Sequence, residues 1–93
     1  MLNEENKNQI AIFKALADPV RLEIIKYLKE AKEEVTCGEV GKATNISKTS
    51  GSYHFKLLQS AGLINARKDA REKYVSLNKS TFDEYITNFY ENI

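Results

Sequence analysis

Apolar residues recur every three or four positions through the first two thirds of the chain, a spacing that predicts amphipathic helices. Four such stretches lie at residues 5–17, 19–31, 37–44 and 48–61. Asp18 and Pro19 separate the first two, because an aspartate can accept from the free N–H groups of a helix start and a proline fits the first helical position. Gly62 predicts the end of the fourth helix, since glycine readily adopts the left-handed conformation that closes a helix.

The third and fourth helices are joined by a tight turn at residues 45–47, an arrangement typical of a helix-turn-helix. Thr36 and Glu39 have the spacing of a capping box, in which each side chain satisfies a backbone N–H near the other. Ser47 is a suitable N-cap for the fourth helix. The same spacing predicts the side chains that face the core. In helix 19–31 these are Leu22, Ile25 and Leu28, with Ile24 and Tyr27 on the flank. In helices 37–44 and 48–61 they are Val40, Ala43, Phe55, Leu58 and Ala61.

From Leu63 onward the apolar period changes to two, which predicts a β-hairpin. Its strands are expected at residues 63–68 and 71–77, on either side of a turn at Asp69 and Ala70. The elements together predict a mainly α fold with a β-hairpin wing. This is a winged helix-turn-helix in the order α-α-α-α-β-β-α, with residues 1–93 as one domain.

The last stretch, about residues 81–92, predicts a helix capped by Ser80 or Thr81. This helix is unusually aromatic for a chain end. A chain of 93 residues has little apolar surface with which to cover it, so a homodimer is expected.

Length and composition narrow the class of protein. Ninety-three residues are too few for a Rossmann enzyme, a barrel or two independent domains. No apolar stretch approaches the roughly 20 residues that cross a bilayer, so no membrane partner is expected. The N-terminus is too polar for a secretory signal and the single cysteine permits no internal disulfide, which predicts a cytoplasmic protein.

Positive charge is concentrated in one segment of a chain whose net charge is only +1. Residues 47–79 contain seven Lys or Arg against two Asp or Glu, a net charge of +5. This distribution predicts a local contact surface for a polyanion such as nucleic acid. Charge alone leaves open the alternative of a plain solvated face.

The second helix of a helix-turn-helix enters the major groove of DNA with its N-terminal residues against the base edges. The candidate DNA-binding residues there are Ser47, Lys48, Thr49, Ser50, Ser52, Tyr53 and Lys56. The wing adds four cations, of which at least two are expected to touch the phosphate backbone: Arg67, Lys68, Arg71 and Lys73. Tyr53 fits either a DNA contact or simple packing, whereas His54 is expected to pack behind the helix.

Three segments resemble the ArsR family of winged-helix repressors, and the resemblance covers nearly the whole chain. They are residues 13–22 (FKALADPVRL), residues 46–58 (ISKTSGSYHFKLL), and residues 61–64 (AGLI) with the hairpin through Tyr74 and Leu77. The resemblance implies a homodimer joined through the first and last helices, about 5–17 and 81–92. It also implies binding to an inverted-repeat operator and repression of transcription.

The chain departs from the metal-sensing members of that family, which carry a Cys-x-Cys pair at the start of the first helix of the helix-turn-helix. Here Thr36 and Gly38 occupy the two ligand positions, with Cys37 between them. The family's other metal site pairs Asp with His on the last helix, where this chain has Asp83 and no histidine. One thiolate is too few for a soft-metal site, so neither a metal nor a cofactor is expected.

Cys37 keeps two interpretations. It is either an inert small residue near a helix start or a redox-active thiol, because a helix N-terminus lowers the pKa of a thiol.

Two further departures from the family concern backbone conformation. Gly51 is expected to loosen the recognition helix, and Ala70, where the family's wing often has glycine, predicts a longer or mobile wing tip.

The sequence therefore predicts a homodimeric transcriptional repressor that binds double-stranded operator DNA through helix 48–61 and the basic wing. No set of residues fits a catalytic site, so an enzyme is not expected. The alternative is a winged-helix module that presents its basic stretch to an acidic protein partner. The sequence identifies no inducer.

Overall fold

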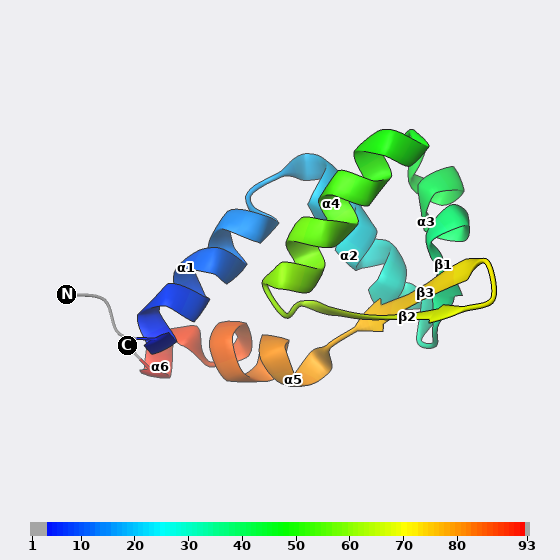
Figure 1. Cartoon of the computed structure of the whole chain (residues 1–93). Coiled ribbons are helices and arrows are strands. Elements are labelled where there is room, and N and C mark those ends of the chain that lie inside the picture. The colour runs from blue at the N-terminus through cyan, green and yellow to red at the C-terminus, as the bar shows by residue number, and fades with distance from the viewer. Residues whose placement is uncertain (1–3, 93) are drawn as a thin grey trace.

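The computed structural model describes residues 4–92, in which short helices surround a small three-stranded sheet (Figure 1). The helical elements are α1 (Glu4–Leu16), α2 (Pro19–Ala31), α3 (Cys37–Thr44), α4 (Lys48–Ser60), α5 (Lys79–Phe82), the π-helical turn η1 (Asp83–Thr87) and α6 (Phe89–Asn92). The strands are β1 (Val35–Thr36), β2 (Ile64–Asp69) and β3 (Glu72–Leu77). The four predicted helices and the hairpin are confirmed. Within residues 4–92 no helix has both the length and the apolar character needed to cross a membrane.

Local capping sets the helix boundaries where the sequence predicts them. Three of the predicted N-cap side chains, Asp18, Thr36 and Ser47, accept from the backbone N–H three residues later, at 3.0 to 3.2 Å. Gly62 has a φ of 78°. The N–H groups of Gly62 and Leu63 donate to the carbonyls of Gln59 and Leu58, each at 3.0 Å, which is the Schellman arrangement of a helix end.

The sheet has the order β1-β3-β2, with both pairs antiparallel. β2 and β3 form the predicted hairpin, in which Ile64 lies opposite Leu77 and Asp69 opposite Glu72. β1 pairs Val35 with Val75 and was not predicted, because a strand of two residues has no period of its own. It fastens the connector after α2 to the base of the wing.

The wing tip is a two-residue turn at Ala70 and Arg71, so the expectation of a longer loop is wrong. Ala70 has a φ of 56°, a left-handed conformation that its Cβ disfavours. Pairing along the whole of both strands outweighs that local cost.

The expected continuous helix over 81–92 is also wrong in detail. Helical structure begins at Lys79, and neither Ser80 nor Thr81 serves as its N-cap, because the Ser80 hydroxyl instead donates to the Asn78 side chain at 2.8 Å. The helix then widens into η1 and is interrupted at Asn88 before α6. No residue of α5 or η1 is fully buried.

The core lies between the helices and one face of the sheet. Its most deeply buried side chains are Ile12, Ile24, Leu28, Val40, Phe55, Leu58, Leu63, Ile64 and Val75. The inner side of α2 is formed by Arg21, Ile24 and Leu28, whereas Leu22 is 43% exposed. Ala43 is exposed too. The predicted core-facing side of α2 was therefore wrong in part. The buried side includes Arg21, and a search for apolar residues alone does not identify a side that contains an arginine.

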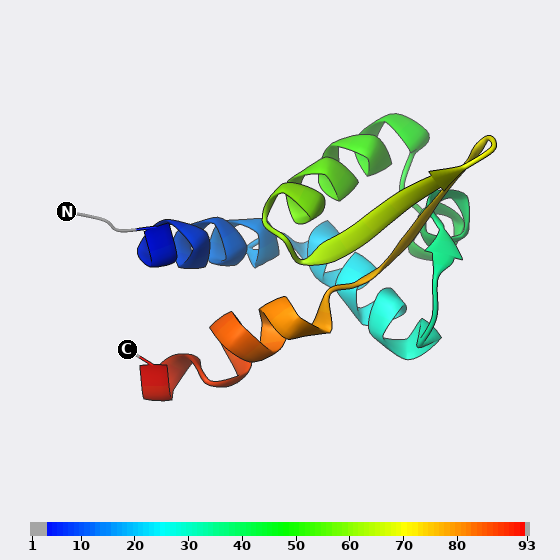
Figure 2. The same ribbon diagram turned by 60° about the horizontal axis from the view of Figure 1, so that its bottom comes forward.

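Helices α1 and α6 lie at the opposite end of the molecule from the wing tip (Figures 1 and 2). The ring of Phe13 in α1 meets the ring of Phe89 in α6 edge-on, with 5.0 Å between centroids. The Asn8 amide donates to the Tyr85 hydroxyl at 3.3 Å. The domain is accordingly elongated, with extents of 41 × 24 × 24 Å.

Candidate nucleic-acid interface

Helix α4 has one buried and one exposed side. Gly51, Phe55 and Leu58 are buried against the rest of the domain. The seven residues predicted to contact DNA are all exposed: Ser47, Lys48, Thr49, Ser50, Ser52, Tyr53 and Lys56. Tyr53 is 60% exposed, so simple packing does not account for it. Hydroxyls, lysines and a phenol on one side of a helix can donate to and accept from base edges and phosphates.

A groove of about 860 Å³ lies between the helix-turn-helix and the wing tip. Five cations line it, from α3, α4 and the wing: Lys42, Lys48, Lys56, Arg71 and Lys73. Glu72 is the single acid among the described lining residues. Such an excess of positive charge in a concave surface attracts a phosphate backbone. Lys42 was not predicted, although the first helix of a helix-turn-helix is known to cross the DNA backbone.

The wing cations are not equivalent. Arg67 Nε donates to both carboxylate oxygens of Glu34 at 2.9 Å, and its guanidinium lies over the Tyr74 ring, 4.5 Å from the centroid. Its Nη1 is also 3.9 Å from Asp69. Arg67 therefore holds the wing to the connector before β1. Three other exposed wing cations form no ion pair with any side chain that the structure describes: Lys68, Arg71 and Lys73.

Cys37 lies half-buried in the groove wall, at the first residue of α3. Burial raises the pKa of its thiol, an effect that Lys73 opposes and Glu72 reinforces. The expectation of a lowered pKa is therefore wrong, because burial disfavours the charged thiolate. A raised pKa keeps the thiol protonated at neutral pH and slows its oxidation. A redox role for Cys37 remains a prediction.

The described residues contain no group of three His, Cys, Asp or Glu side chains that could hold a metal ion. The absence of metal sensing stays a prediction from the sequence.

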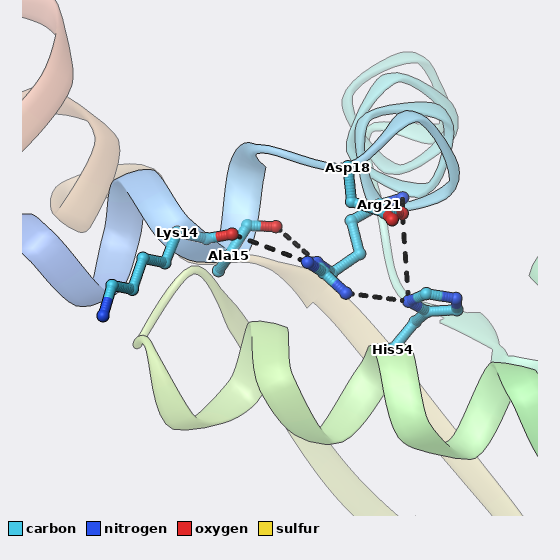
Figure 3. A network of polar contacts seen from close by, with 5 residues as sticks. All are labelled: Lys14, Ala15, Asp18, Arg21 and His54. Carbon is cyan, nitrogen blue, oxygen red and sulfur yellow. Dashed lines mark hydrogen bonds and ion pairs between the residues drawn. The ribbon is translucent and has the colours of Figure 1, made fainter.

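His54 lies on the inner side of α4, with its side chain 13% exposed. It faces Arg21 and Asp18 at the start of α2 (Figure 3). Arg21 was not among the candidate residues. The signal that could have identified it is its position three and seven residues before Ile24 and Leu28, on the buried side of α2.

Comparison with known proteins agrees with this geometry. A helix-turn-helix domain family matches residues 16–67. The chain is 48% identical over its full length to YceK of Bacillus subtilis strain 168, an uncharacterized HTH-type transcriptional regulator, and spans 93% of that protein. The solution structure of Mb0332 from Mycobacterium bovis superposes with a TM-score of 0.74 at 26% identity, covering 85% of this chain and 72% of the other. That structure is a homodimeric winged helix-turn-helix DNA-binding domain of a possible ArsR-family regulator.

The chain belongs to the ArsR family. This ArsR-family protein is a transcriptional regulator with a winged helix-turn-helix fold, and not an enzyme. It is also 35% identical to the transcriptional repressor SdpR of Bacillus subtilis strain 168 over 75 residues, which cover 81% of each chain.

Proposed function

We propose that this regulator is a homodimeric repressor that acts in the cytoplasm on an inverted-repeat operator. Helix α4 would enter the major groove and the wing would follow the adjacent backbone. The groove between α4 and the wing carries the proposal, because four of the candidate residues, Ser47, Lys48, Ser52 and Lys56, line it together with two unpaired wing cations. The similarity to the repressor SdpR supports the direction of regulation.

Apolar side chains left exposed on the terminal helices support the dimer. Ile10 and Phe13 of α1 are 38% and 39% exposed, and Tyr90 of α6 is 83% exposed. The Phe13–Phe89 contact places these helices side by side. A second copy could bury these exposed side chains under two-fold symmetry, as in the homodimeric Mb0332 domain. Two α4 helices would then meet successive major grooves about one helical turn apart.

Selection from a random duplex library, followed by sequencing of the bound DNA, tests this function. Enrichment of an inverted repeat with half-sites about one helical turn apart is the expected result. Lys48→Glu should abolish the preference for the selected site, whereas Lys29→Glu, an equal charge change at an exposed residue outside the groove, should leave it intact. Salt-sensitive binding without enrichment would contradict operator recognition and favour a non-specific nucleic-acid binder or a module that contacts an acidic protein partner.

A further inference from the structure

One buried charged side chain joins three helical segments (Figure 3). Arg21 is only 9% exposed. Its Nε donates to the carbonyl of Ala15 and its Nη2 to the carbonyl of Lys14 (3.5 Å), both in the last turn of α1. Its Nη1 lies 3.0 Å from Nδ1 of His54, in the middle of α4. Arg21 thus donates to two carbonyls in the last turn of α1 and contacts the recognition helix with the same guanidinium.

This contact determines which ring nitrogen carries the proton when His54 is neutral. A guanidinium has only N–H donors, so Nδ1 must accept and the proton of the neutral imidazole must be on Nε2. A protonated imidazole carries hydrogen on both nitrogens and cannot accept from Arg21. The N–H group that protonation creates at Nδ1 can turn to the carboxylate of Asp18, whose Oδ2 lies 4.0 Å from Nδ1.

Asp18 is ionised over the range in which imidazoles titrate. The backbone N–H of Arg21 lowers the pKa of the Asp18 carboxyl, burial opposes this effect, and the charges of Arg21 and His54 add to it. Arg21 and Asp18 are the charged groups that face His54, while the ring of Tyr53 lies edge-on at 5.4 Å. No described ion pair or hydrogen bond joins His54 to α3 or β2, which also pack on α4, and the contribution of α1 is two backbone carbonyls that accept from Arg21.

We propose that Arg21 and His54 are positioning residues that tie the recognition helix to the end of α1, and that protonation of His54 releases the tie. Nδ1 then turns from Arg21 to Asp18. The proposal rests on the proposed function, in which α1 contributes to the dimer interface and α4 reads DNA. The tie fixes α4 relative to the two-fold axis, so its release lowers affinity for the operator. Non-specific affinity, which comes from the lysines and arginines of the groove, is retained.

The test compares affinity for the selected operator with affinity for random duplex at about pH 8 and about pH 5.5. The ratio of the two affinities should fall roughly ten-fold in the wild type at the lower pH, the value of one hydrogen bond to a charged group. His54→Asn keeps an acceptor near the Nδ1 position and does not titrate, so it should keep the high ratio at both pH values. His54→Ala has no acceptor and should give the low ratio at both.

His54 is the single histidine of the chain, so His54→Asn removes every imidazole from the titration. The same pH dependence in the wild type and in His54→Asn would overturn the proposal. So would a high ratio in His54→Ala at about pH 8.

Nitrogen-15 NMR without DNA separates this proposal from the proposed function. We expect the Nε2–H tautomer at about pH 8, and we expect the backbone signals of Ala15 and Arg21 to follow the titration of His54. An Nδ1–H tautomer, or a titration that leaves Ala15 unchanged, would overturn the tie whether or not an operator is found. The expected tautomer and coupling without any selected operator would support the tie and contradict the proposed function.

Discussion

Two regions of this molecule differ in how completely one chain covers them. Residues 35–77 form a reading region, in which Val40, Leu58, Leu63 and Val75 are inaccessible to solvent. The terminal region, α1 with residues 79–92, has aromatic side chains on its surface and a C-terminal helix interrupted at Asn88. Side chains of one chain therefore cover the reading region, among them Ile12, Ile24 and Leu28 of α1 and α2, whereas apolar side chains of the terminal region stay exposed.

This contrast separates two properties of a dimeric DNA-binding protein. The shape of each reading surface depends on packing inside one chain. In the proposed dimer, the distance between the two reading surfaces would depend on the terminal helices and on how each is fastened to α4. Substitutions in the two regions should accordingly change different measurements.

The largest effect on stability is expected from Leu58→Ala. Leu58 is fully buried, so its truncation removes apolar contacts and leaves a cavity, at a cost of about 3 kcal/mol in the free energy of unfolding. Tyr90→Ala is the matched change in the terminal region and should cost less than about 0.5 kcal/mol, since surface substitutions seldom cost more. Urea denaturation of dilute protein measures both. Equal losses would show that the two regions do not differ as described.

Phe13→Glu tests the terminal region as the dimer interface. A charge within the exposed apolar surface of α1 should weaken dimerisation by about 2 kcal/mol or more, roughly thirty-fold. Ala11→Glu, at an exposed position of the same helix, is the control for added charge. Sedimentation equilibrium reads the dimerisation constant, and circular dichroism checks that the fold survives. A dimer that Phe13→Glu leaves as tight as the wild type would rule out this surface as the interface.

Gly51→Ala tests the packing of α4 within the reading region. Gly51 lies inside α4, where alanine is favoured over glycine by about 1 kcal/mol. A Cβ at this position would meet Phe55 at 3.8 Å and Ile46 at 3.9 Å, which is ordinary van der Waals contact. We therefore expect thermal unfolding at a higher temperature with DNA binding retained. A lower unfolding temperature would mean that the inner side of α4 has no room for a methyl group.

The smallest effect concerns Cys37. Burial raises the pKa of its thiol in the folded state, so the folded protein retains the proton to higher pH than the unfolded chain does. The stability that this shift contributes is fully present below the pKa of the thiol in the unfolded chain, about 8.5. It is lost as the pH rises through the pKa of the thiol in the folded protein. Between about pH 7 and about pH 10, the urea concentration at the midpoint of unfolding should fall further in the wild type than in Cys37→Ser. Identical falls would show that the thiol is hydrated as freely in the folded protein as in the unfolded chain.

Features governed by neighbours in the sequence were predicted correctly. Asp18, Thr36 and Ser47 cap helices because their side chains reach N–H groups only three residues away. Gly62 closes α4 through equally local bonds. The exposed side of α4 follows from the period of its buried residues, and the exposure of the candidate DNA-binding residues was recoverable in the same way.

Features governed by distant neighbours were missed. β1 exists because Val35 meets Val75 forty residues later. The side of α2 that faces inward is chosen by Arg21, whose partners come from α1 and α4. The pKa of Cys37 is raised by burial beside the wing, which its position at a helix start does not reveal. In each case the deciding contact joins residues that no local pattern connects.

The ion pair between Arg67 and Glu34 has a consequence for the thermodynamics of binding. A cation that neutralises a DNA phosphate displaces about 0.9 of a condensed counterion, and this release appears as the slope of the logarithm of the binding constant against the logarithm of salt concentration. Arg67 already has a carboxylate against it, so it adds little to that slope. The three unpaired wing cations would contribute most of the wing's share, and Glu34→Gln should make the dependence on salt steeper.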